Sequence, residues 1–109
     1  MFRKVSINLI TEAAQRVVSK VHPEQIILFG SYAYGKPNID SDVDLLLVIN
    51  KGSRKERQSV LRNASDALDP RPFPIDIVVR SKSEIKSRIK QGDFFLQDVM
   101  KHGRILYER

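Results

Sequence analysis

Two aspartates, placed two residues apart at the start of an apolar run, are the residues of this sequence best suited to chemistry. Asp42 and Asp44 lead directly into Leu45–Ile49, which has the length and composition of a buried strand. Side chains two apart on a strand point to the same side, so both carboxylates would project together. Two adjacent anions repel each other unless a cation lies between them. The pair therefore predicts a site for Mg²⁺, which prefers carboxylate oxygens.

A third acid interrupts another apolar run further along the chain. Asp76 lies within Ile75–Val79, whose other residues are all β-branched and indicate a short buried strand. A lone carboxylate in such a strand is costly and needs a partner. If this strand lies beside residues 43–49, Asp76 can complete a cluster with Asp42 and Asp44. Three carboxylates in one place suit a displacement assisted by two metal ions. Asp76 would then be the best-placed general base for the attacking hydroxyl.

The phosphate-binding part of such a site is predicted at Gly30-Ser31. Gly30 follows a short apolar run and permits both a sharp turn and a close approach of phosphate to backbone N–H groups. Ser31 adds a hydroxyl donor, and a helical turn after it would direct further N–H groups at the same anion. Taken alone, each of these features is more common as an ordinary turn or strand end. Their occurrence on three successive predicted strands favours one catalytic cluster.

Two other motifs fit less well. Residues 30–36 have the glycine and lysine spacing of a Walker A loop, but Pro37 stands where that loop needs a hydroxyl for Mg²⁺. Ser31 lacks the G-x-S-x-G turn of a hydrolase nucleophile, and nothing marks His22 or His102 as its base.

Hydrophobic periodicity predicts an α/β (α+β) fold. Residues 1–109 are expected to form one domain, because this length supports one modest core and no linker interrupts it. The predicted strands are 25–29, 43–49, 75–79 and an edge strand at 105–107. The predicted helices are 7–21 with Ser6 as N-cap, 54–68, a helix opened by the capping box Ser81–Glu84 and ending near Gly92, and 93–102.

The whole pattern resembles the nucleotidyltransferase superfamily of the DNA polymerase β type. Gly30-Ser31, ten intervening residues, Asp42-x-Asp44 and a later Asp76 carry the resemblance. Within the superfamily the chain is similar to the minimal nucleotidyltransferases, small prokaryotic proteins encoded beside HEPN-domain partners in toxin–antitoxin pairs. The resemblance implies a mixed sheet flanked by helices, and it implies that Gly30 and Ser31 bind a triphosphate. It also implies that Asp42 and Asp44 hold metal, and that Asp76 completes the metal site and activates the acceptor.

The resemblance further implies a reaction and a partner. The expected reaction transfers AMP from ATP, with two Mg²⁺ ions, to a tyrosine hydroxyl of a HEPN-type toxin, so that the protein acts as an antitoxin. Two alternatives stay open: an antitoxin that only masks its partner, and transfer to a small-molecule hydroxyl such as that of an aminoglycoside. The second would need acceptor-binding elements beyond the core. A chain of 109 residues leaves little room for them, so we expect a protein partner to deliver the acceptor.

Composition sets further bounds. The net charge is +6 with a pI of about 9.8, and the excess lies mainly in residues 51–62 and 80–90. These basic segments could attract ATP, an acidic protein surface or nucleic acid. Nucleic acid is possible but not favoured, because few aromatic residues accompany the basic ones. The sequence has no cysteine and no apolar run of membrane-spanning length, which favours a cytoplasmic protein without a membrane partner.

Overall fold

The structure is a computed structural model that describes residues 4–109. The α+β class is confirmed, and each helix and strand expected from the sequence is present. In chain order the elements are α1 (Ile7–Val21), β1 (Gln25–Phe29), β2 (Val43–Ile49), α2 (Arg54–Ala67), β3 (Ile75–Ser81), α3 (Lys82–Lys90), α4 (Phe94–His102) and β4 (Arg104–Glu108). The predicted domain of residues 1–109 includes residues 1–3, which lie outside the described part of the chain.

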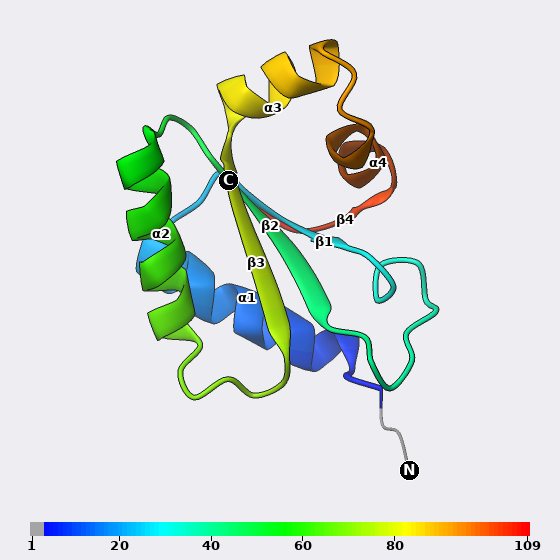
Figure 1. Ribbon diagram of the computed structural model, residues 1–109. Coiled ribbons are helices and arrows are strands. Elements are labelled where there is room, and N and C mark those ends of the chain that lie inside the picture. Colours follow the sequence, from blue (N-terminus) through cyan, green and yellow to red (C-terminus); the bar gives the residue numbers. More distant parts are fainter. Residues whose placement is uncertain (1–3) are drawn as a thin grey trace.

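The four strands form one mixed sheet in the order β3-β2-β1-β4 (Figure 1). β1 pairs with β2 and with β4 in the antiparallel direction, whereas β2 and β3 are parallel. The parallel pair needs a crossover, which α2 provides. β2 and β1 are the central strands, while β3 and β4 form the two edges.

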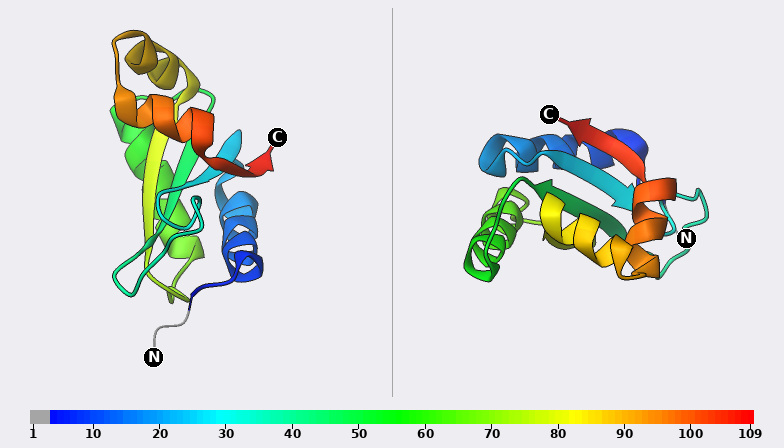
Figure 2. Two further views of the ribbon diagram at one scale, coloured as in Figure 1. Left: turned by 90° about the vertical axis from the view of Figure 1, so that its right-hand side faces the viewer. Right: turned by 90° about the horizontal axis from the view of Figure 1, so that it is seen from above.

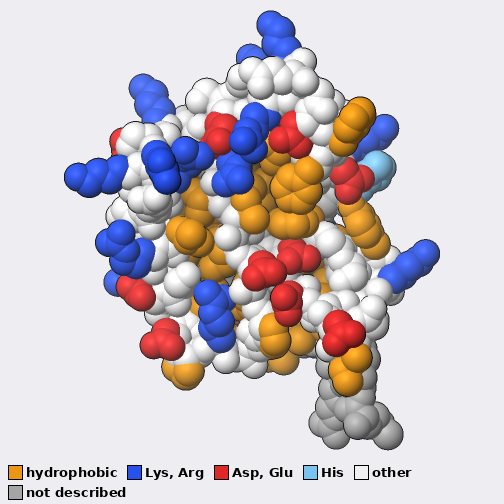
Figure 3. All heavy atoms as spheres, in the orientation of Figure 1, with side chains coloured by type: hydrophobic (Ala, Val, Ile, Leu, Met, Phe, Trp, Pro, Cys, Tyr) orange, Lys and Arg blue, Asp and Glu red, His pale blue; other side chains and the backbone are white. Residues whose placement is uncertain are grey.

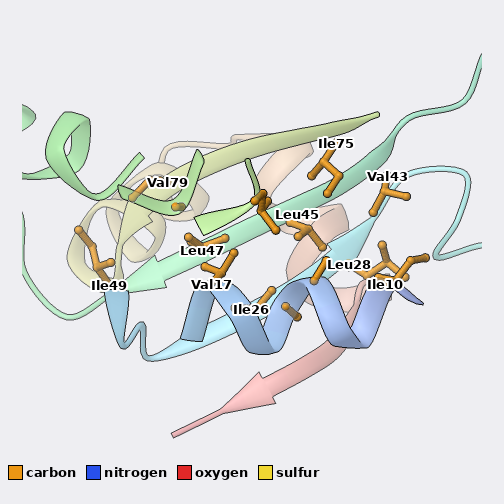
Figure 4. Packing of buried hydrophobic residues seen from close by; sticks show 14 residues of the cluster. Ile10, Val17, Ile26, Leu28, Val43, Leu45, Leu47, Ile49, Ile75 and Val79 are labelled. Atoms are coloured by element: carbon orange, nitrogen blue, oxygen red, sulfur yellow. The ribbon is translucent and has the colours of Figure 1, made fainter. Parts of the chain in front are cut away.

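α1 and α2 pack on one face of the sheet. Alternate residues of the strands point to this face, and with the apolar stripes of the two helices they form the larger core. Figure 4 shows Ile10 and Val17 of α1 packed against Ile26, Leu28 and neighbouring side chains of the central strands. This packing fixes the register of the strands, since a slip by one residue would turn the apolar set to the opposite face.

The opposite face is covered only in part. α3 and α4 lie over one end of it, as the two views of Figure 2 show, and pack there against Ile27, Leu46 and Val48. This second core is smaller and stops where the apolar alternation of β2 gives way to Asp44. The carboxylates of the predicted site therefore fall on the half of this face that no helix covers.

Polar caps fix where the helices begin, as the sequence predicted. Ser6 accepts a hydrogen bond from the N–H of Leu9, and Ser81 accepts one from the N–H of Glu84, both at 3.2 Å. In a complete capping box the Glu84 carboxylate would also accept a hydrogen bond from the N–H of Ser81, and this bond is not formed within residues 4–109. Both carboxylate oxygens of Glu84 instead accept hydrogen bonds from Arg57 at 2.9 Å, because a charged donor competes better than a neutral one. Glu84 thereby ties α3 to α2.

The predicted boundaries shift by one or two residues. β3 continues to Ser81 rather than ending at residue 79, because Arg80 and Ser81 still pair with Val48 and Ile49 of β2. Within residues 4–109 no helix is both long and apolar enough to cross a membrane.

His22 ends α1 in a conformation that favours glycine. Its φ is 48°, in the left-handed region, while its N–H donates to the carbonyl of Val18 at 3.0 Å. We expect His22→Gly to raise the free energy of unfolding by about 0.5–1 kcal/mol, because glycine adopts this conformation without a Cβ clash. Urea unfolding would measure the change, with Ser19→Gly inside the same helix as a control that should be destabilising. A loss of stability in His22→Gly would assign the role to the imidazole instead.

Candidate functional site

The register of the two parallel strands brings two of the predicted acids side by side. Asp44 of β2 is the direct partner of Asp76 of β3. Both point to the partly covered face of the sheet, because Leu46 and Val78, two residues further along each strand, belong to its smaller core. Asp76 is exposed, whereas Asp44 is half-buried. The sequence could place each acid on a strand, and the sheet order brings them together.

The electrostatics of Asp44 show how closely the acids influence one another. Burial, the neighbouring carboxylate of Asp76 and that of Asp42 together raise the pKa of Asp44 to about 6, with burial the largest cause. Asp42 lies immediately before β2 and is exposed. Within residues 4–109 this carboxylate thus lies among like charges and forms no ion pair, an arrangement that costs folding energy and is common at functional sites.

The predicted phosphate turn is built against the same aspartate. Phe29, the last residue of β1, pairs with Asp44, so Gly30 leaves the sheet directly beside that carboxylate. Gly30 has a φ of 75°, and a Cβ at this position would collide with the Asp44 carboxylate. Gly30 is therefore required twice: for its left-handed backbone and for the space that Asp44 occupies.

The chain after Gly30 coils into a short helical turn. The carbonyl of Gly30 accepts hydrogen bonds from the N–H groups of Ala33 (3.0 Å) and Tyr34 (3.2 Å). The N–H groups of Ser31 and Tyr32, at the start of this turn, have no protein partner within residues 4–109. Free N–H groups at the start of a helical turn attract anions. This is the arrangement expected of a phosphate-binding turn.

The space-filling view shows how these groups lie on the surface. Acidic side chains gather near the middle of the partly covered face, below a hydrophobic patch and beside Lys and Arg side chains that lie above and to the left (Figure 3). In residues 4–109 no three His, Cys, Asp or Glu side chains are arranged so as to hold a metal ion as they stand. Metal binding by Asp42, Asp44 and Asp76 therefore stays a prediction.

Sequence reasoning missed the contacts that hold the turn from the side of α4. The hydroxyl of Tyr34 donates to one carboxylate oxygen of Asp98, and the other oxygen lies 2.9 Å from Nδ1 of His102. The hydrogen bonds from Tyr34 and His102 lower the pKa of Asp98. The hydrogen bond between Tyr34 and Asp98 also raises the pKa of the Tyr34 hydroxyl. The ring of Phe95 in α4 packs edge to face against the ring of Phe29, with 5.4 Å between the ring centroids. Only the Asp98–His102 spacing of four on one helix could have been read from the sequence.

Comparison with known proteins supports a common architecture. The family model of the nucleotidyltransferase domain matches residues 10–106. A proposed nucleotidyltransferase from Sulfolobus solfataricus has a similar structure, with a TM-score of 0.60, 23% identity, and coverage of 94% of this chain and 79% of that chain. Among curated proteins none matches.

Two further structures of similar fold are toxin–antitoxin complexes. One contains AMP-PNP and has a TM-score of 0.56 and 21% identity, covering 91% of this chain and 73% of that chain. The other is a mutant of the toxin–antitoxin MntA-HpeT with two Asp-to-Glu replacements two positions apart. Its TM-score is 0.53 and its identity 20%, over 96% of this chain and 75% of that chain.

Proposed function

Because the chain belongs to the nucleotidyltransferase domain family, we propose that it transfers AMP from ATP to a tyrosine hydroxyl of a HEPN-type toxin and so acts as an antitoxin. The observation that carries the proposal is the meeting of Gly30, Asp44 and Asp76 at one uncovered part of the sheet. A phosphate-binding turn and a pair of carboxylates are the two parts that nucleotidyl transfer requires.

Similar structures support the nucleotide and the partner. One toxin–antitoxin complex of this fold was crystallised with AMP-PNP, a nonreacting analogue of ATP. In the MntA-HpeT complex, two aspartates with the spacing of Asp42 and Asp44 were replaced by glutamate. The tyrosine acceptor and the HEPN class of the partner come from the resemblance of the Gly-Ser and Asp-x-Asp motif to the minimal nucleotidyltransferases.

The residues present fit divalent cations. Burial and the charges of Asp76 and Asp42 raise the pKa of Asp44, and a bound cation would offset both effects. Asp42, Asp44 and Asp76 are the carboxylates that would hold two such ions. Bound Mg²⁺ would neutralise phosphate charge and lower the pKa of the attacking hydroxyl.

The chain's own residues have separate tasks in the proposed reaction. The free N–H groups of Ser31 and Tyr32, with the Ser31 hydroxyl, bind and orient the triphosphate. Asp76 accepts the proton of the acceptor hydroxyl, whose oxygen forms a bond to the α-phosphorus of ATP. The bond between that phosphorus and the bridging oxygen breaks, and pyrophosphate leaves. The acceptor approaches from the β3 side, where Asp76 is exposed and Asp44 is not.

Transfer to the partner can be tested directly. We would incubate the purified protein with ATP labelled at the α-phosphate, Mg²⁺ and the product of the neighbouring gene, and follow label on that product. Label is expected with the wild type and not with Asp44→Ala, while γ-labelled ATP should leave no label in either case. Mass spectrometry of the product would identify the modified side chain.

The alternatives predict different outcomes of the same assay. An antitoxin that only masks its partner would bind it tightly and leave it unlabelled. Its Asp44→Ala variant would neutralise the partner as well as the wild type does. Transfer to a small-molecule hydroxyl would label an added aminoglycoside rather than the protein. Label on RNA would point to the nucleic-acid acceptor that the basic segments allow.

A further inference from the structure

The outer edge of β3, the strand that carries Asp76, borders a groove of about 390 Å³. α2 forms its other wall. The groove is lined by apolar side chains, among them Leu61, Ile77 and Val79, and by arginines. Since β3 is the last strand of the sheet on this side, no further strand of residues 4–109 pairs with its outer edge.

The backbone of β3 offers hydrogen-bonding groups to this groove. Val43 donates to the carbonyl of Pro74, so by the alternation of a parallel ladder Ile75, Ile77 and Val79 direct their backbone groups away from β2. Arg71 donates to the carbonyl of Ile75 and Arg80 to that of Val79, each at 2.8 Å. Ile77 lies between them, and within the described residues no side chain bonds to its N–H or carbonyl. An edge strand with open groups is a template for an added strand.

The charged side chains that line the groove are all arginines. Three arginines line it, Arg54, Arg57 and Arg80, and among residues 4–109 one glutamate, Glu84, pairs with two of them. Glu84 lies 2.9 Å from Arg57 and 3.8 Å from Arg80, so it compensates a single charge of the three. Arg54 has no ion-pair or hydrogen-bond partner among residues 4–109.

The position of Arg54 gives folding no advantage. It is the first residue of α2, where the helix dipole disfavours a cation. The Nε atom of Arg57 is buried and has no hydrogen-bond partner within the described chain. Arg54 is therefore available for a carboxylate from outside, whereas Arg57 is bound to Glu84 and its unpaired Nε is closed to solvent.

We propose that this groove docks an extended, acidic segment of a partner protein as a fifth strand beside β3. Backbone bonds to Ile77 and to the N–H of Val79 would hold the segment, and its carboxylates would pair with Arg54 and Arg80. The docking itself is independent of catalysis. Its consequence for transfer rests on the proposed function: the segment would lie along the strand whose Asp76 deprotonates the acceptor.

Binding to the ¹⁵N-labelled protein can be tested by NMR with an acetylated peptide of alternating Glu and Val. We expect shifts of the amide signals of Ile77 and Val79 and of the first turns of α2, and none with the matching Lys-Val peptide. Arg54→Glu should weaken peptide binding about fivefold or more, and Lys55→Glu less than about twofold. Lys55 is exposed and next to Arg54 but does not line the groove. Each variant replaces one cation with one anion, so both carry the same net charge and differ only in where the change lies.

Each outcome decides the proposal. Absence of binding would overturn it. Equal weakening by both variants, or shifts centred on α3, would also overturn it, because either result would show general charge attraction. Glu at the start of α2 favours the helix, so unfolding cannot explain a loss in Arg54→Glu. Asp44→Ala should bind the peptide like the wild type. Label transfer without peptide binding would reject the groove alone, and peptide binding without label transfer would reject the proposed function alone.

Discussion

Replacing Asp44 with Asn should abolish nucleotidyl transfer and, at the same time, make the protein more stable at pH 7. Transfer should fall by about a thousandfold or more, because several kcal/mol of charge stabilisation depend on this carboxylate. The gain in stability has a different origin. Burial and the charges of Asp76 and Asp42 raise the pKa of Asp44 to about 6, which shows that its ionised form is unfavourable in the folded protein.

The sign of the pH dependence follows from proton binding. In the unfolded chain an aspartate ionises near pH 3.9, so between about pH 4 and pH 6 the folded protein holds more protons. The contribution of Asp44 to stability therefore falls as the pH rises through this range, and the deficit persists at neutral pH. Water screens part of the repulsion because the side chain is only half-buried, so we expect a deficit of about 1–2 kcal/mol.

Thermal unfolding in EDTA between pH 4 and pH 8 would measure this deficit. Asp44→Asn should melt roughly 4–10 °C above the wild type at pH 7 and close to it at pH 4. Glu12→Gln, which removes an exposed carboxylate on α1, should show no comparable gain. A variant that melts lower than the wild type at every pH would show that Asp44 serves the fold. In that case the reading of this aspartate as a strained functional residue would be wrong.

The sequence predicts the features that neighbouring residues determine, and it does not predict which distant residues meet. Asp44 and Asp76 could be placed on their strands because each interrupts an apolar run, and Ser6 could be placed as a cap because its effect reaches only three residues. That Asp44 lies opposite Asp76 depends on the order of the strands, which no local pattern contains.

Competition between partners is equally hidden from sequence patterns. The sequence of Ser81–Glu84 predicts a capping box, but Arg57, distant in the chain, takes the Glu84 carboxylate. Tyr34 and Asp98 are separated by 64 residues and meet only because α4 folds over the end of β1. The resemblance to a known family supplied the assignment of roles that spacing alone left open.

Replacing Gly30 with Ala should disable transfer while costing the fold little more than a similar change elsewhere in the same loop. The φ of 75° strains any residue with a Cβ, by about 1–2 kcal/mol. In addition the new Cβ meets the carboxylate of Asp44, a flexible side chain that can turn away. The fold therefore survives, but the carboxylate leaves the position from which it would act on the nucleotide. We expect transfer to fall by about a hundredfold or more, as small displacements at a reacting centre do.

Gly35 supplies the matched control for this argument. Its φ of 74° is nearly that of Gly30, yet a Cβ there would have nothing within 4 Å. Gly35→Ala should lose a similar free energy of unfolding in urea and keep most of its transfer activity. If both variants lost activity to the same extent, the conformation of the loop would matter and not the contact with Asp44. If Gly30→Ala stayed active, the turn and the carboxylate would be independent. The pair thus separates backbone strain from the coupling between the phosphate turn and Asp44, which is the feature of this site that the proposed chemistry needs most.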